Sequence, residues 1–325
     1  MPPGKSRIYS ADQFQLSEQL GKGSFGVVYK GLDLLSNTPV AVKQIDLESC
    51  DEDIDEIQKE ITILSNCNFP QITKYYGSFV KGFKLWIIME LLDAGSCLDL
   101  LIPQPFSEPY IAILCRDLLK ALNYLHESGK IHRDLKAANV LVNNFGQVKI
   151  ADFGVATQLT NNLSRRNTFV GTPFWMPPEV ILQQDYNYKA DIWSLGITAI
   201  EFALGKPPLA NLHPMKVLFL IPDNPPPTLP RNKNYSPEFQ NFVKLCLHKN
   251  PRDRPTAKQL LRHKFIKNAG DNKLLINLIN IRKDWESKNR DYNKISKKIY
   301  EPTIISDDPN NPISNIAFDF DTIKL

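Results

Sequence analysis

Two short stretches decide the fold of this chain, HRDLKAAN at residues 132–139 and DFG at residues 152–154. The first places a carboxylate (Asp134), a lysine (Lys136) and a carboxamide (Asn139) within one tight loop. The second adds the carboxylate of Asp152 on a turn that glycine allows to bend sharply. Transfer of a phosphoryl group from a metal-bound nucleotide needs an acid that orients the attacking hydroxyl and hard oxygen ligands for Mg²⁺. We therefore expect a phosphoryl-transfer site here. The alternative is that these residues only form and cap turns.

A glycine-rich stretch, GKGSFGVV at residues 21–28, lies upstream and contains the pattern GxGxxG. In a dinucleotide-binding unit the third glycine leads into a helix, whereas here it leads into strand-forming residues. We interpret the stretch as the turn of a β-hairpin that covers ATP, with a purely structural hairpin as the alternative. A Walker P-loop is excluded because no Gly-Lys-Ser or Gly-Lys-Thr follows at the required spacing. The residues expected to contact the nucleotide here are Leu20, Gly21, Lys22, Gly23, Ser24, Phe25, Gly26, Val27 and Val28.

A lysine stands in the next apolar strand, in VAVK at residues 40–43. Lys43 needs a partner in such surroundings, and the α- and β-phosphates of the nucleotide provide one. An acid on the helix expected at residues 53–65 provides another, and we choose Glu60 because it lies near the middle of that helix. A surface ion pair of little energetic value is the alternative.

The pattern along the chain predicts an α+β protein with a small strand-rich lobe and a larger helical lobe. We place a lead-in at residues 1–13, the first lobe at 14–89, a hinge at 90–93 and the second lobe at 94–266. Helices are expected at residues 53–65, 110–127, 189–203, 237–248 and 257–262. Residues 267–325 form a tail, with a helix at 274–285 and a polar, Pro-rich end expected to be mobile. No internal repeat is apparent.

The hinge is expected to hold the adenine through backbone groups of Glu90 and Leu92. We also assign Ala41, Met89 and Leu141 to the nucleotide site.

The composition excludes several other classes of protein. The 325 residues carry a net charge of only +4, whereas a dedicated nucleic-acid binder would carry a dense basic stripe. No apolar run approaches the roughly 20 residues that span a bilayer, and the start lacks the apolar core of a signal peptide. We therefore expect an intracellular protein, in the cytoplasm or also in the nucleus. The five cysteines are scattered, which favours reduced thiols over disulfides or a zinc site.

The catalytic roles follow from the chemistry of each side chain. Asp134 should orient the substrate hydroxyl and accept its proton, and Lys136 should steady the transferring phosphoryl charge. Asn139 and Asp152 should hold Mg²⁺. Asp191 should begin a buried helix and accept hydrogen bonds from the backbone of the catalytic loop.

The segment from residue 152 to 179 offers hydroxyls for regulation. A phosphate on Thr168 would add roughly −2 charge and could pair with Arg133, which would order the segment. The alternative is that Thr168 is only a polar loop residue. We expect Thr172 to pack against the catalytic residues and shape the acceptor pocket. Arg254 is expected to pair with Glu179 inside the larger lobe.

These motifs, in this order, resemble the eukaryotic protein kinase family over residues 14–266. The stretches at 131–139 and 166–176 are similar to those of the germinal-centre kinases of the sterile-twenty group. The class III branch, which includes a fungal kinase linked to sporulation, is the nearest match. Lys136, two residues after Asp134, is typical of serine/threonine kinases. One departure is Pro-Pro-Glu at residues 177–179, where the family usually has Ala-Pro-Glu.

The resemblance implies a serine/threonine protein kinase that uses Mg-ATP, phosphorylates itself at Thr168 and serves polarity, morphogenesis, sporulation or stress signalling. Its partners would be protein substrates and, through the tail, an armadillo-like scaffold, because FDFD at residues 318–321 is similar to short docking peptides. A flexible solvated end is the alternative, and a homodimer stays open. Two other functions are possible for such a fold: an inactive kinase-fold scaffold, and a small-molecule phosphotransferase. The first would lack Lys43, Asp134 or Asp152, and the second would lack the Gly-Thr-Pro at residues 171–173.

Overall fold

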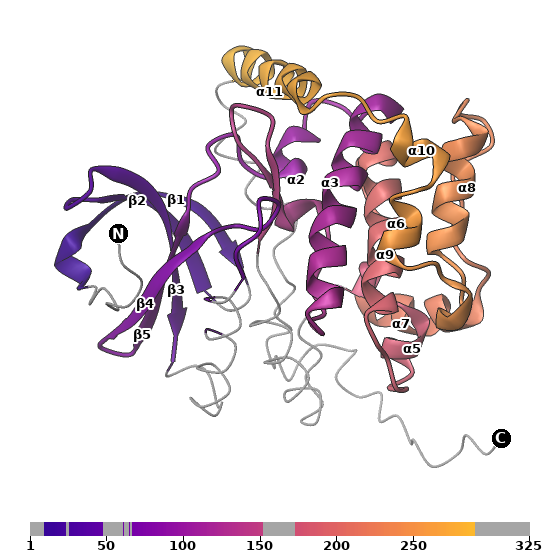
Figure 1. Cartoon of the computed structure of the whole chain (residues 1–325), viewed down its shortest axis with the longest axis horizontal. Helices are drawn as coiled ribbons and strands as arrows, with labels where there is room; N and C mark the ends of the chain where they lie inside the picture. Colours follow the sequence, from indigo (N-terminus) through magenta and orange to yellow (C-terminus); the bar gives the residue numbers. More distant parts are fainter. Residues whose placement is uncertain are drawn as a thin grey trace, which may run out of the picture.

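Five strands from the first part of the chain pair into one antiparallel sheet with the order β1-β2-β3-β5-β4. The computed structural model describes residues 10–23, 26–47, 61, 65, 67–151 and 173–289. The strands are β1 (Phe14–Gly23), β2 (Gly26–Asp33), β3 (Thr38–Asp46), β4 (Tyr75–Lys81) and β5 (Lys84–Glu90), preceded by the 3₁₀ turn η1 (Ala11–Gln13). Figure 1 shows this sheet on one side of the molecule and the helices on the other.

The two faces of the sheet bury alternate residues of β5, as the period of two in a strand requires. Leu85 and Ile87 pack with Ile45 on one face. Trp86 and Ile88 pack with Phe14 and the valines of β3 on the other. Because both faces are covered, the register of β3 against β5 is fixed, and with it the side of the sheet that carries Lys43.

The second lobe is built from helices around one large apolar core. Its longer helices are α3 (Glu108–Glu127), α6 (Lys189–Leu204), α7 (Pro214–Asp223), α8 (Pro237–Cys246) and α11 (Ile276–Lys288). Short elements connect them: α2 (Cys97–Leu100), η2 (Ala137–Asn139), β6 (Val140–Val142), β7 (Val148–Ile150), η4 (Pro173–Trp175), α5 (Pro178–Ile181), η5 (Pro251–Asp253), α9 (Ala257–Leu260), α10 (Lys264–Lys267) and η6 (Asn272–Leu275). Helix α6 is buried from residue 190 to 203, which explains why most of its residues are apolar.

The structure confirms the α+β class and the two-lobe arrangement, and it corrects several helix ends. Helix α3 begins at residue 108 instead of 110, because Ser107 takes an extended conformation and Pro109 fits the first helical turn. Helix α8 ends at 246 instead of 248, and α9 ends at 260 instead of 262. Helix α7 was not predicted. The helix expected at residues 53–65 lies outside the described residues, apart from residues 61 and 65.

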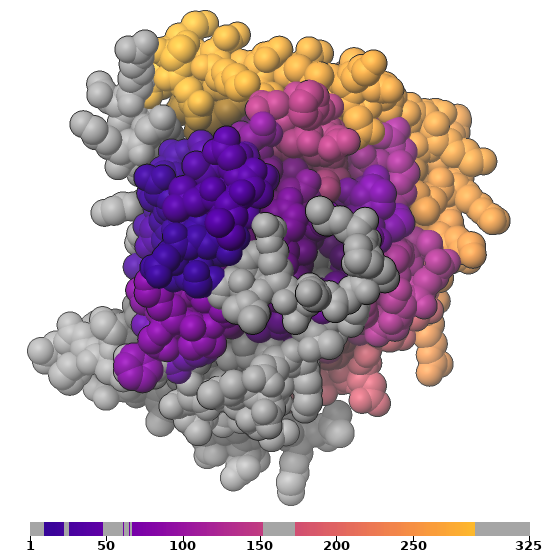
Figure 2. Space-filling model, turned by 60° about the vertical axis from the view of Figure 1, so that its left-hand side comes forward, coloured from indigo at the N-terminus to yellow at the C-terminus, as the bar shows by residue number. Residues whose placement is uncertain are grey.

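The beginning of the tail is anchored to the second lobe by a polar network. Arg116 of α3 donates hydrogen bonds to the Gly270 carbonyl, at 2.6 Å, and to the Asn272 side chain. The Asn272 amide nitrogen in turn donates to Asp117, at 2.6 Å, and to the Gly146 carbonyl, at 3.1 Å. Helix α11 follows, covering residues 276–288 where 274–285 was expected. Figure 2 shows the tail residues in orange to yellow along one edge of the molecule.

Two expectations drawn from composition can be compared with the described part of the chain. None of its helices is long and apolar enough to cross a membrane. Four of the five cysteines are described, and all four are free and buried. Burial raises the pKa of the Cys115 thiol far above its ordinary value, which keeps that thiol protonated.

Candidate active site

The side chains of Asp134, Lys136 and Asn139 meet at one carboxylate oxygen. Asp134 Oδ2 accepts hydrogen bonds from Lys136 Nζ, at 2.9 Å, and from Asn139 Nδ2, at 2.8 Å. Asn139 Nδ2 also donates to the backbone carbonyl of Asp134, at 2.7 Å. One third of the Asp134 side chain is exposed, so a substrate hydroxyl can reach it. The loop therefore presents a positioned carboxylate with an ammonium group beside it.

Asp191, the third residue of α6, holds the catalytic loop by its backbone, as predicted. Its carboxylate accepts hydrogen bonds from the amides of His132, at 2.9 Å, and Arg133, at 2.8 Å. A third bond, of 2.8 Å, joins it to His126 Nε2 of α3. Burial alone would raise the pKa of Asp191, but the His126 hydrogen bond and charge, with the His132 amide, keep it below its ordinary value. Sequence reasoning missed His126, because nothing in the α3 pattern marks this partner.

His132 joins the catalytic loop to the end of β7. Its Nδ1 accepts a hydrogen bond from the Asp134 amide, at 3.3 Å, so its Nε2 carries the proton and donates to the Ala151 carbonyl, at 3.1 Å. The Ala151 amide donates to the Asn139 carbonyl, at 2.9 Å. Residue 151 is therefore fixed next to Asn139, directly before Asp152 in the chain.

Several residues assigned to the nucleotide share one face of the sheet. Directly paired residues of antiparallel strands lie on the same face, and such pairs join Gly21 to Val28, Val28 to Lys43, and Lys43 to Ile87. The neighbouring row joins Ala41 to Met89.

The structure places one of the assigned residues away from this row. Val27 pairs with Gln44 and so lies on the opposite face. Leu20 lies at an irregularity of β1 between Gln19 and Gly21, so the strand pairing assigns it to neither face, and it is 45% exposed. Lys22 and Gly23, also assigned to the nucleotide, lie at the end of β1, where Gly23 pairs with Gly26. Gly26 must be glycine, because a Cβ there would collide with the Gln44 carbonyl of β3.

The segment expected to be the hinge is braced by the β6–β7 hairpin. The Glu90 carboxylate accepts hydrogen bonds from Lys149 Nζ, at 2.7 Å, and from the Lys74 amide, at 3.1 Å. Asp93 accepts from the amide and the side chain of Asn144, in the turn between β6 and β7. The Leu92 carbonyl accepts from the Gly95 amide, at 3.2 Å. Leu141 of β6 bridges to Ser96, which follows this segment.

One oxygen atom near Asp134 is suited to bind a magnesium ion. Both hydrogen bonds of the Asn139 amide nitrogen go to Asp134, so Asn139 Oδ1 is the atom left to act as a ligand. An amide oxygen is a hard ligand of the kind that Mg²⁺ accepts. Within the described ranges, no cluster of three or more His, Cys, Asp or Glu side chains is arranged to hold a metal ion. Asp152, the second expected ligand, lies outside those ranges.

Other candidate residues also lie outside the described part of the chain. They are Ser24, Phe25, Glu60, Thr168 and Thr172, so their predicted roles stay predictions. Arg133, the expected partner of Thr168, is described. Its backbone has a φ of 71°, a conformation that residues other than glycine rarely adopt. Its Nε is buried without a hydrogen-bond partner among the described residues.

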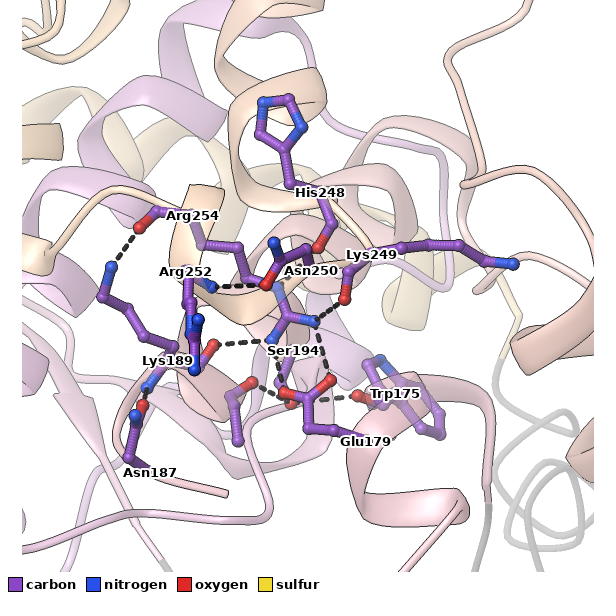
Figure 3. A network of polar contacts seen from close by, with 11 residues as sticks. Trp175, Glu179, Asn187, Lys189, Ser194, His248, Lys249, Asn250, Arg252 and Arg254 are labelled. Carbon is purple, nitrogen blue, oxygen red and sulfur yellow. Dashed lines mark hydrogen bonds and ion pairs between the residues drawn. The ribbon is translucent and has the colours of Figure 1, made fainter. Parts of the chain in front are cut away.

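The predicted pair between Arg254 and Glu179 is confirmed, and all five guanidinium donors are used. Nη1 and Nη2 donate to the two Glu179 oxygens, at 2.6 and 2.7 Å. Three more bonds go to the carbonyls of His248, Lys189 and Lys249. Figure 3 shows the Glu179 carboxylate facing the guanidinium at the centre of this network. The proline at residue 177 leaves this pair in place.

Glu201 of α6 is a buried acid that sequence reasoning missed. Its Oε2 accepts hydrogen bonds from the Ala137 amide and from Trp175 Nε1, both at 2.9 Å. A single acid inside a long apolar helix was the available signal, because a buried carboxylate needs partners.

Comparison with known proteins gives consistent matches. The protein kinase domain family matches residues 14–266. The chain is 50% identical over 296 residues to the serine/threonine-protein kinase sid1 of Schizosaccharomyces pombe, covering 91% of this chain and 61% of sid1. It is 51% identical over 267 residues to the serine/threonine-protein kinase dst1 of Dictyostelium discoideum, covering 82% of this chain and 36% of dst1. It is 47% identical over 316 residues to the serine/threonine-protein kinase ppk11 of S. pombe, covering 96% of this chain and 98% of ppk11.

The family match covers most of the chain, which therefore belongs to the protein kinase family. Within that family it stands with the serine/threonine protein kinases, as the resemblance predicted, and its relatives agree with the germinal-centre branch of the sterile-twenty group. The chain spans less than two thirds of the length of sid1 and dst1, and nearly all of ppk11.

Proposed function

We propose that this chain transfers the γ-phosphoryl group of ATP to serine and threonine hydroxyls of protein substrates. The observation that carries the proposal is the arrangement of Asp134, whose Oδ2 is held by Lys136 and Asn139 at 2.9 and 2.8 Å. These two hydrogen bonds fix the carboxylate, and none of the described residues donates a hydrogen bond to Oδ1. That oxygen is therefore available to a substrate hydroxyl.

Each residue of the loop has a separate task in the proposed reaction. Bound Mg-ATP supplies the phosphoryl group and a cation that offsets its charge. Asp134 orients the attacking hydroxyl and receives its proton at Oδ1. The Lys136 ammonium lies beside the same carboxylate and offsets negative charge at the acceptor. Asn139 presents Oδ1 as a magnesium ligand. Lys43 lies on the sheet face that also carries Gly21, Val28, Ala41 and Met89, which are assigned to the nucleotide.

Phosphorylation of Thr168 is the proposed activating event. Among the described residues none accepts a hydrogen bond from the buried Arg133 Nε, which supports this idea, because a buried donor costs free energy until an acceptor reaches it. A phosphate supplies three acceptor oxygens and roughly −2 charge. We expect mass spectrometry to find phosphate on Thr168 after incubation with Mg-ATP, and Arg133→Ala to remove the gain in activity that follows.

The remaining proposals concern the cellular setting and rest on the family resemblance. We propose a cytoplasmic or nuclear kinase serving polarity, morphogenesis, sporulation or stress signalling. An armadillo-like scaffold bound through residues 318–321 and a homodimer are the proposed assemblies.

The test of activity compares Asp134→Asn with wild type in phosphate transfer to a threonine peptide and in nucleotide affinity. We expect Asp134→Asn to bind Mg-ATP as wild type does while its transfer rate falls by about a hundredfold or more. The matched control is Asp284→Asn, on an exposed position of α11, which should transfer at the wild-type rate. If wild type phosphorylated at Thr168 binds ATP yet transfers no faster than Asp134→Asn, the enzyme proposal is wrong and the kinase-fold scaffold takes its place.

A further inference from the structure

Four polar residues form a row along the buried helix α6. Asp191, Ser194, Thr198 and Glu201 follow one another at spacings of three, four and three residues, which puts them on one face of the helix. None of the four is more than 3% exposed. The rest of this helix is almost entirely apolar, so a row of this kind needs partners on neighbouring elements.

The partners of the row belong to two segments, the catalytic loop and the turn η4. Asp191 holds the amides of His132 and Arg133, and Thr198 Oγ1 lies 3.2 Å from the Leu135 carbonyl. Ser194 Oγ donates to the Trp175 carbonyl, at 2.9 Å, a contact drawn in Figure 3. Helix α6 therefore holds both segments. Of the two, Asp191 and Thr198 contact only the catalytic loop, and Ser194 contacts only η4.

Glu201 differs from the other three because one of its atoms contacts both segments. Its Oε2 accepts from the Ala137 amide and from the Trp175 indole, both at 2.9 Å. Ala137 follows Lys136, which contacts the Asp134 carboxylate. Trp175 comes three residues after Thr172, at the point where the described chain resumes. Trp175 and the residue next to Lys136 therefore share a single acceptor atom.

The surroundings of Glu201 favour a role beyond filling space. Burial raises its pKa to about 7, and the Ala137 amide, the Trp175 indole and the Lys136 charge oppose that rise. A buried acid of this kind is costly for stability, whereas a methionine would fill the same volume without that cost. Two hydrogen bonds offset part of this cost, and they go to the catalytic loop and to η4.

We propose that Glu201 is a positioning residue that couples the segment after Thr172 to the catalytic loop, through Trp175 on one side and Ala137 on the other. The inference rests on the proposed function. It assigns to Glu201 and Trp175 the task of bringing Lys136 and Asp134 to their working positions when the segment that ends at Trp175 is in place.

The experiment compares four single variants of the full chain. Glu201→Gln keeps an acceptor oxygen, Glu201→Met removes it, and Trp175→Phe removes only the indole donor. Trp193→Phe is the matched control, because Trp193 is a second buried indole of the same core whose Nε1 has no hydrogen-bond partner among the described residues. Two quantities are measured: the kcat and KM values for a threonine peptide and for ATP, and hydrogen exchange of a peptic fragment containing residues 131–139.

We expect Glu201→Met and Trp175→Phe to lower kcat by about tenfold while the KM for ATP stays within about twofold. Both should speed hydrogen exchange in the catalytic loop. Glu201→Gln should stay near wild type in both measurements, and so should Trp193→Phe. The double variant Trp175→Phe with Glu201→Met should lose no more activity than Glu201→Met alone, because both changes break the same link.

Three results would overturn the inference. One is a folded Glu201→Met protein with wild-type kcat and wild-type exchange in the catalytic loop. Another is an equal loss in Trp175→Phe and Trp193→Phe, which would reveal a packing effect. The third is a fully additive double variant. If wild type transfers no phosphate, the proposed function fails, and hydrogen exchange alone still decides whether Glu201 couples the two segments.

Discussion

Replacing Glu179 by glutamine tests whether the ion pair to Arg254 stabilises the helical lobe. The pair lies fully inside the protein, since the two side chains are 4% and 0% exposed. The substitution keeps the size of the side chain and removes its charge. Arg254 is then left as a buried cation that retains three carbonyl partners and loses its counter-ion.

The magnitude follows from the burial of the pair. Removing one partner of a buried ion pair costs about 3–5 kcal/mol, because the remaining charge is neither solvated nor paired. The three carbonyl acceptors, together with the Trp193 ring 5.1 Å from the guanidinium carbon, stay in place and still stabilise the cation. We therefore expect the lower end, about 3 kcal/mol, which corresponds to a fall in Tm of roughly 6–12 °C for a lobe of this size.

Thermal unfolding followed by circular dichroism measures this effect, and the chain offers a matched control. Glu238 and Lys264 form an ion pair with the same 2.6 Å separation, but their side chains are 30% and 72% exposed. Glu238→Gln should leave Tm unchanged within error, because solvent screens an exposed pair. The double variant Glu179→Met with Arg254→Met should have a higher Tm than Glu179→Gln, because it leaves no buried charge without a counter-ion. If Glu179→Gln and Glu238→Gln melt at the same temperature, the argument from burial is wrong.

Three further predictions concern single positions. Gly196→Ala should lower stability by about 1–3 kcal/mol in urea unfolding, because the new methyl would lie 2.7 Å from Cys246 Cβ. The raised pKa of Glu201, from 4.5 to about 7, means that the unfolded chain loses this proton first, so stability falls as pH rises through that window. Urea unfolding at several pH values should thus show Glu201→Gln gaining up to roughly 3 kcal/mol on wild type between pH 4.5 and 7. Gly146→Ala should loosen the tail, because φ is +78° and a Cβ would collide with the Asn272 carbonyl; limited proteolysis after residue 268 should become faster.

Local patterns in the sequence were enough to predict most of the fold. The short apolar runs of β3 and β5 and the long apolar run of α6 each lie within a few neighbouring residues, and their lengths distinguish strand from helix. Helix α7 was missed because Pro222 argues against a helix; in the structure it lies in the last turn, so the helix ends one residue after it. Helix α2 carries a readable signal, a capping box between Ser96 and Asp99, but it is only four residues long.

The candidate site was predictable where a motif keeps its chemistry within a few residues. Asp134, Lys136 and Asn139 lie within six positions, and their mutual hydrogen bonds follow from that spacing. Glu201 was missed because its partners Ala137 and Trp175 lie 64 and 26 residues away, and only the packing of α6 brings them together. Long-range hydrogen bonds of this kind leave no period in the sequence.

The anchoring of the tail makes the folded unit longer than the matched family domain. The match to the family model ends at residue 266, yet Leu275, Leu278 and Ile279 are at most 3% exposed. A fragment cut at that boundary would expose their apolar surface and remove the partners that Arg116 finds at residues 270 and 272. For expression or crystallisation, we therefore expect a stable fragment of this chain to extend about twenty residues beyond the matched domain, to the end of α11.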